Sequence, residues 1–334
     1  MNELNGLAPL PASAPGFVAI GFGQVLERIY RLLKENLRTY VAIAAMPLGV
    51  MLVFYALMLG GIFTLLPGLM AKDAPPPTPA AIGSLLSVLL LGTIPIVMIF
   101  ALYESALSYA ALRLNAGAPA TAHDAWQMAW DKMGRYLGLA VLRTFIALLP
   151  LLAFAALCGT GAGTYFVLAG NQTQPAWLAL ALPLLMLLYL VVVGVMVTLM
   201  IWLSFSYPAS LNEDLPAWQA IQRSWQLTRG VRGWIFLAAL VIYAISYVVF
   251  LLFEMMLAAV ILLGVAVASA LPLPQFLGLV ALGVVALLLL ASLFLFMALT
   301  MGAYITAFSI YYQDQLRREA WQAGLTVCAE PLVE

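Results

Sequence analysis

Long apolar stretches alternate with short polar segments along the whole chain. A bilayer core about 30 Å thick is crossed by roughly 20 apolar residues in a helix. Six stretches approach or exceed that length, at 40–66, 84–108, 139–168, 177–205, 235–268 and 276–310. The pattern therefore predicts about six membrane-spanning helices. The last three are long enough to tilt or to extend past the membrane surface.

Basic residues gather in alternate connections between these stretches. Short cytoplasmic loops keep Lys and Arg, whereas translocated loops lack them. Four basic groups fall on one side: Arg28, Arg31, Lys34 and Arg38; Arg113, Lys132 and Arg135; Arg223, Arg229 and Arg232; Arg317 and Arg318. The intervening loops hold only Lys72, which Asp73 balances. The sequence thus predicts that both termini are cytoplasmic.

A three-part repeat organises the chain. Each part begins with a short amphipathic segment that runs into a span, and a short outer loop and a second span follow. We expect an all-α fold, a polytopic membrane bundle of about six transmembrane helices with three cytoplasmic amphipathic helices in a threefold helix-span-span repeat. Residues 1–20 are expected to form a disordered cytoplasmic leader, 21–313 the six-span membrane domain, and 314–334 a cytoplasmic tail.

The predicted amphipathic helices have recognisable starts and apolar faces. The second begins with a capping-box pattern, in which Asp124 follows Thr121 by three positions. In the third, the spacing places Trp218, Ile221 and Trp225 on one face, which we expect to point inward.

Two interpretations of these helices remain open. They can be ordinary re-entry helices that pack on the bundle, or they can bind anionic lipid headgroups at the inner leaflet. The candidate headgroup contacts are Arg28, Arg31, Lys34, Arg38, Lys132, Arg135, Arg223, Arg229 and Arg232.

Composition agrees with the pattern of spans. Of the 334 residues, 65% are apolar and 8% are charged, and the mean hydropathy is +1.06. A soluble domain has a much larger charged fraction. The net charge of zero gives no field that favours nucleic acid. The cysteines Cys158 and Cys328 are expected on opposite sides of the membrane, and neither belongs to a metal-binding motif.

Three ionisable residues lie inside or at the edge of apolar stretches. Glu104 and Arg143 fall near the cytoplasmic ends of consecutive spans, which predicts an interhelical ion pair with either a structural or a transport role. Glu254 lies in the outer half of the fifth span without a basic residue at similar depth. It is expected to be protonated or to line a polar cavity.

Several prolines fall within the apolar stretches. In membrane helices such prolines can kink or break the helix, as they do where transporters bind substrate. They are Pro47, Pro95, Pro150 and Pro183.

No catalytic motif is present in the sequence. There is no phosphate-binding glycine loop and no HExxH, and the sole histidine, His123, precedes a predicted helix outside the bilayer. We therefore expect no enzyme activity and no cofactor. An enzyme acting on lipid headgroups would need Asp124, Asp131, Glu213 and Asp214 to converge.

Two cytoplasmic segments carry motifs of a known family. The first fits G-x-[IV]-L-x-R-x-[FY]-x-L at Gly23, Val25, Leu26, Arg28, Tyr30 and Leu32. The second combines a proline, a glutamate and A-x-x-x-S-x-x-L at Pro208, Glu213, Ala220, Ser224 and Leu227. On these motifs the chain resembles the membrane domain associated with bacterial glycerophosphoryl diester phosphodiesterases and related bacterial six-span families. The resemblance implies a bacterial inner-membrane protein of unassigned activity that lacks the catalytic phosphodiesterase domain.

The favoured interpretation is a non-enzymatic integral inner-membrane protein. Its amphipathic helices would organise contacts with membrane lipids or with a membrane or cytoplasmic protein partner. The alternative is a transporter of a small solute or lipid, with a polar intramembrane cavity near Glu104, Arg143 and Glu254.

Overall fold

The computed structural model describes residues 20–70, 79–169, 177–270 and 275–322, so that residues 1–19 of the expected leader lie outside them. Within these ranges every regular element is an α-helix, as the sequence predicts. The helices are α1 (Phe22–Glu35), α2 (Leu37–Met70), α3 (Pro79–Asn115), α4 (Ala122–Asp131), α5 (Met133–Ala169), α6 (Trp177–Trp202), α7 (Ser206–Asn212), α8 (Ala217–Thr228), α9 (Arg232–Ala270) and α10 (Gln275–Gln322).

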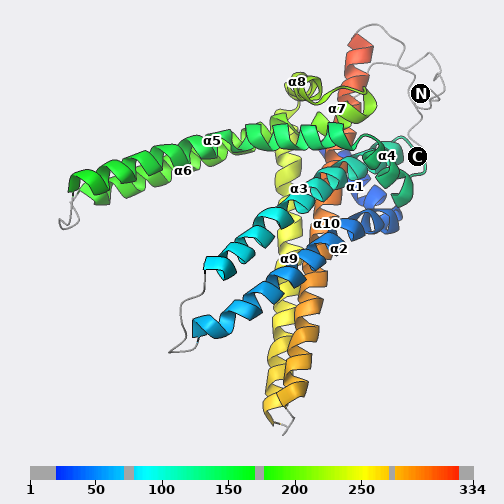
Figure 1. The fold of residues 1–334 in the computed structure, drawn as a ribbon. Helices are drawn as coiled ribbons and strands as arrows, with labels where there is room; N and C mark the ends of the chain where they lie inside the picture. The colour runs from blue at the N-terminus through cyan, green and yellow to red at the C-terminus, as the bar shows by residue number, and fades with distance from the viewer. Residues whose placement is uncertain (1–19, 71–78, 170–176, 271–274, 323–334) are drawn as a thin grey trace.

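Three helical hairpins form the body of the molecule (Figure 1). They are α2 with α3, α5 with α6, and α9 with α10, and each is preceded by one of the short helices α1, α4 and α8. The hairpins diverge from a common end, where α1, α4, α7 and α8 gather. We call these four short helices the cap. The arrangement confirms the expected helix-span-span repeat.

Six segments of the described chain are long and apolar enough to cross a membrane. The fourth, Pro183–Asn212, combines most of α6 with α7, and none of its most apolar part is buried within the protein. Large side chains on all sides of α6, such as Leu184, Met186 and Val191, are exposed. A helix that is apolar all round is surrounded by lipid or by protein. The chain is therefore an integral, multi-pass membrane protein.

Buried side chains concentrate where the hairpins meet the cap. Val25 and Ile29 of α1 pack in one cluster with Phe205, Ile235 and Tyr312. Other clusters seat Ala125 and Ala129 of α4 against α2 and α3, and Ala220 and Ile221 of α8 against α5 and α7. Packing therefore fixes the cap end of the molecule.

Two helix boundaries reflect local chemistry in the sequence. Thr121 accepts a hydrogen bond from the backbone N–H of Asp124, and the Asp124 carboxylate accepts one from the Thr121 N–H, so the predicted capping box is confirmed. The expected boundary at residue 313 falls inside α10, which continues to Gln322. Asp314 and Gln315 are buried there.

Two expectations about α8 were wrong. Ile221 faces inward as expected, but Trp218 is 55% exposed and Trp225 is 42% exposed. The small or aliphatic side chains of Ala220, Ser224 and Leu227 take the inner face instead. The two indole rings are thus left on the outer surface of the cap.

The prolines that could break helices do not do so. Pro47, Pro95, Pro150 and Pro183 all lie within continuous helices. The fourth span is interrupted elsewhere, at residues 203–205 between α6 and α7. Six of the seven residues of α7 are fully buried, so the interruption is enclosed by protein.

Candidate functional site

A side chain from the cap forms hydrogen bonds with the backbone at the interruption between α6 and α7. The Ser224 hydroxyl donates to the Trp202 carbonyl at 2.7 Å and accepts from the Phe205 N–H at 3.0 Å. Irregular backbone at membrane depth needs such partners because lipid offers none. One hydroxyl of α8 therefore allows the fourth span to bend, and the bend positions Ser204, Tyr207 and Pro208.

A cavity of about 120 Å³ lies beside this bend. Its walls come from all three hairpins: Glu104 and Ser108 of α3, Arg143 of α5, Ser204, Tyr207 and Pro208 of the bend, and Met301, Tyr304, Ile305 and Phe308 of α10. The cavity therefore lies at the junction of the repeats.

The predicted pair of Glu104 and Arg143 is confirmed and borders the cavity. Arg143 Nη1 donates to Glu104 Oε2 at 2.6 Å, and both side chains keep about a quarter of their surface exposed, 24% for Arg143 and 27% for Glu104. The Arg143 guanidinium also lies 5.6 Å from the centre of the Tyr207 ring. The pair therefore joins α3, α5 and the bend.

Two hydroxyl groups at the cavity wall add to its polarity. Ser204 and Tyr207 are 4% and 2% exposed. Their oxygen atoms have no hydrogen-bond partner among the described residues. A buried hydroxyl without a partner costs about 1–3 kcal/mol. The site thus offers one carboxylate, one guanidinium and two hydroxyls to a small polar occupant.

Glu254 does not belong to this site. It lies on α9 and is partly buried, and it is not among the residues that line the cavity. Its position on α9 is roughly 33 Å from Arg232 at 1.5 Å per residue.

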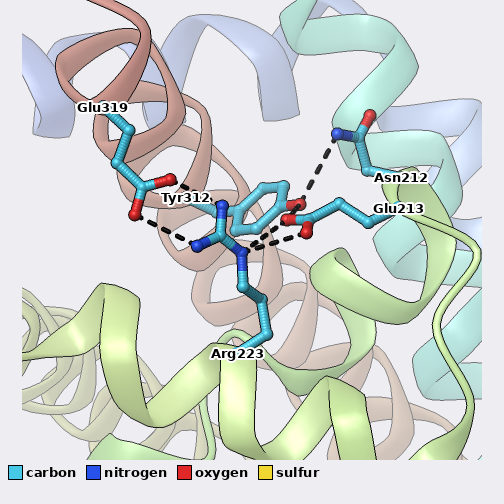
Figure 2. Close-up of polar contacts among 5 residues, drawn as sticks. All are labelled: Asn212, Glu213, Arg223, Tyr312 and Glu319. Carbon is cyan, nitrogen blue, oxygen red and sulfur yellow. Dashed lines mark hydrogen bonds and ion pairs between the residues drawn. The ribbon is translucent and has the colours of Figure 1, made fainter. Parts of the chain in front are cut away.

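A second polar centre holds the cap together (Figure 2). Arg223 of α8 donates from Nε to both carboxylate oxygens of Glu213, at 3.1 and 3.0 Å, and from Nη1 and Nη2 to those of Glu319, at 3.1 and 2.6 Å. Tyr312 of α10 donates to Glu213 at 2.8 Å. Burial lowers the pKa of Arg223, but the hydrogen bonds to Glu319 and Glu213 outweigh it, and the pKa is raised. The guanidinium remains charged and clamps α8 to α10.

A third set of charges connects the second repeat to the third. Asp214 accepts hydrogen bonds from Lys132 and, at 2.8 Å, from Arg135. These hydrogen bonds, that from Lys132 first, lower the pKa of the Asp214 carboxyl. Asp214 has a positive φ of 54°, a conformation that Asp tolerates better than most residues. The turn before α8 is thus held to the start of α5.

Six of the nine candidate headgroup contacts have a protein partner in the structure. Arg28 donates to the Asn115 carbonyl at 2.8 Å, and Arg31 pairs with Glu27 at 2.8 Å. Lys34 lies 5.8 Å from the centre of the Tyr30 ring. Lys132, Arg135 and Arg223 bind carboxylates as described above.

Three other candidate cations have no carboxylate partner among the described residues. Arg38 and Arg229 are exposed. Arg232, at the start of α9, has its guanidinium 4.5 Å from the centre of the Trp202 ring. Its Nε and Nη2 atoms are buried and have no hydrogen-bond partner in the described part of the chain.

Three of the four carboxylates that an enzyme would need to bring together have separate partners, namely Asp124, Glu213 and Asp214. Glu213 binds Arg223 and Tyr312, whereas Asp214 binds Lys132 and Arg135. Asp124 caps α4, and the hydrogen bond from Thr121 is the main cause of its lowered pKa. In the ranges that the structure describes, no cluster of three or more His, Cys, Asp or Glu could hold a metal ion.

The sequence did not reveal the bend at 203–205, the contacts of Ser224 or the Arg223 network. Pro208, Glu213 and Ser224 were available signals, because all three belong to the second family motif. A scan against models of known protein families, a search of curated proteins and a search of solved structures found no match.

Proposed function

We propose that this protein is a non-enzymatic integral membrane protein that organises lipid at the cytoplasmic leaflet through its cap. The supporting observation is the outer surface of the amphipathic helices. Tyr30 of α1, Trp130 of α4 and Trp218 of α8 are 65%, 40% and 55% exposed. Aromatic side chains of this kind favour the headgroup region of a bilayer.

Basic residues complement these aromatic side chains. Arg38 and Arg229 are exposed and are available to anionic headgroups, each with an attraction of about 1 kcal/mol near a charged leaflet. The internal ion pairs support the same proposal, because a cap that is clamped to α10 presents its outer surface in one fixed arrangement. The proposed location is a bacterial inner membrane with both termini in the cytoplasm. The proposed partners are membrane lipids, with a membrane or cytoplasmic protein as a further partner.

The test is the selectivity of lipid retention. Purified protein in detergent is offered equal amounts of phosphatidylglycerol and phosphatidylcholine, and bound lipid is counted by native mass spectrometry. The double change Arg38→Gln and Arg229→Gln is expected to lower phosphatidylglycerol retention about five-fold or more, which corresponds to about 1 kcal/mol. The matched control is Arg31→Gln, because Glu27 already neutralises Arg31. Equal retention in wild type and the double variant would count against the proposal.

A second candidate function is transport of a small solute or a lipid. The observation that favours it is the cavity between the three hairpins, with the Glu104–Arg143 pair and the unpartnered Ser204 and Tyr207 at its wall. An interrupted helix beside a polar cavity is an arrangement that transporters use.

A further inference from the structure

An open cavity separates the second hairpin from the third. Its volume is about 580 Å³, and its walls include Gly194, Val197, Ile201 and Trp202 of α6 with Arg232 and Phe236 of α9. It lies where α6 ends and α9 begins, close to the cap. Figure 1 shows that the two hairpins diverge from this point.

The walls of this cavity differ along its length. At the cap end, the Arg232 guanidinium lies against the Trp202 ring. Farther along α6, the walls are formed by Ile201, Val197 and Gly194, together with Thr198, whose hydroxyl is satisfied by the Gly194 carbonyl. A Cβ atom placed on Gly194 would meet no other atom within 4 Å, so the space there is open. The cavity is thus cationic at one end and apolar along the rest.

The cap fixes the cationic end. The Trp202 ring lies 4.6 Å from the Trp225 ring of α8, and the Trp202 carbonyl accepts the hydrogen bond from Ser224. Arg232 is therefore held against an aromatic ring that is itself held in place. A guanidinium that stacks on a ring keeps its N–H edge for two parallel hydrogen bonds to an oxyanion such as a phosphodiester.

We propose that this cavity binds one anionic phospholipid, with its phosphodiester at Arg232 and an acyl chain along the α6 wall. The inference rests on the proposed function and gives it a defined site. Charge complementarity selects the anionic headgroup, because no carboxylate lines the cavity. The apolar walls and the lateral opening between two lipid-exposed hairpins select a lipid over a water-soluble phosphate.

The test uses the full chain in detergent micelles with phosphatidylglycerol and phosphatidylcholine as the two probes. In native mass spectrometry of the wild type, one phosphatidylglycerol is expected to stay bound at higher collision energies than any other lipid. Arg232→Gln is expected to lower the retention of this lipid about five-fold or more. Gly194→Leu fills the apolar end and leaves Arg232 and Trp202 unchanged, so it is expected to lower retention even if Arg232→Gln disturbs folding.

The control is Arg31→Gln, which makes the same change of charge as Arg232→Gln at a residue that does not line the cavity. Wild-type retention in both Arg232→Gln and Gly194→Leu would overturn the proposed site. If the change at Arg38 and Arg229 still lowered retention, the broader proposed function would stand without this site. If no variant lowered retention, both would fall. A loss in Gly194→Leu alone would also overturn the site, because a chain would bind there without its headgroup.

Discussion

Glu104 and Arg143 illustrate how a charged pair persists within apolar spans. Each would be costly alone at membrane depth, but they are 2.6 Å apart, and each keeps about a quarter of its side chain exposed. Their attraction and their partial hydration together offset desolvation. The sequence predicted this pair because both residues lie at similar depth on consecutive spans.

A structural role and a transport role for the pair predict different results. Glu104→Gln leaves Arg143 without its carboxylate and is expected to destabilise the protein by about 1–3 kcal/mol, below the cost for a fully buried pair. In the double variant with Arg143→Gln, much of that stability should return. Thermal unfolding in detergent measures the change.

Mass spectrometry of co-purifying molecules then separates the two roles. If the cavity binds a solute or lipid through its charges, the double variant is expected to regain stability and still to lose that ligand. A double variant that keeps the wild-type set of co-purifying molecules would make the pair structural only. Asp214→Asn is the control. It also removes a carboxylate from an ion pair, but Asp214 lies outside the cavity.

Side-chain partners were the least predictable features at this scale. The sequence identified Arg223 and Lys132 as cations, but not the carboxylates that bind them. Glu319 is 96 residues from Arg223, and Asp214 is 82 residues from Lys132. Residues this far apart become neighbours only through the packing of the hairpins, so a local pattern carries no information about them.

Among the elements, α8 is a short helix that joins several others. It contacts α5, α6 and α7, and its Arg223 reaches α10. Its apolar face was predictable from spacing, but the direction of Trp218 and Trp225 was not. An indole ring is compatible both with a protein core and with a membrane interface, so periodicity cannot distinguish the two environments.

The interruption of the fourth span is expected to depend on the Ser224 hydroxyl. Ser224→Ala leaves the Trp202 carbonyl and the Phe205 N–H without their side-chain partner in a buried position, at an expected cost of about 2 kcal/mol in unfolding free energy. Ser105→Ala is the matched control, because Ser105 is equally buried but donates only to the Leu102 carbonyl of its own helix. Thermal unfolding in detergent should show a clearly larger loss for Ser224→Ala. Equal losses would mean that the bend does not depend on Ser224.

At the scale of the whole molecule, the six spans and the threefold repeat followed from the sequence. The length of an apolar run and the thickness of a bilayer are enough to predict them, for example at α9 and α10. The divergence of the hairpins was not predictable, because lipid and protein neighbours are equally apolar. Leu184 or Met186 on α6 would look the same in sequence with either neighbour.

Orientation can be tested on the intact chain. The basic residues predict that the cap and both termini are cytoplasmic. Green fluorescent protein fused after residue 334 is expected to fluoresce, and alkaline phosphatase fused at the same point is expected to be inactive. Phosphatase fused within residues 170–176, a loop that the sequence predicts to be external, is expected to be active. The reverse pattern would invert the topology and would place the cap outside.

The contacts of Ser224 also impose an order on biosynthesis. Ser224 lies 22 residues after Trp202, so it is still inside the ribosome when the end of α6 emerges. Until α8 emerges from the ribosome, the backbone at 203–205 has no lasting partner. The Arg223 clamp needs a still later segment, because Glu319 belongs to α10. The fourth span can therefore be inserted early, but the cap around it is clamped only after α10 has been made.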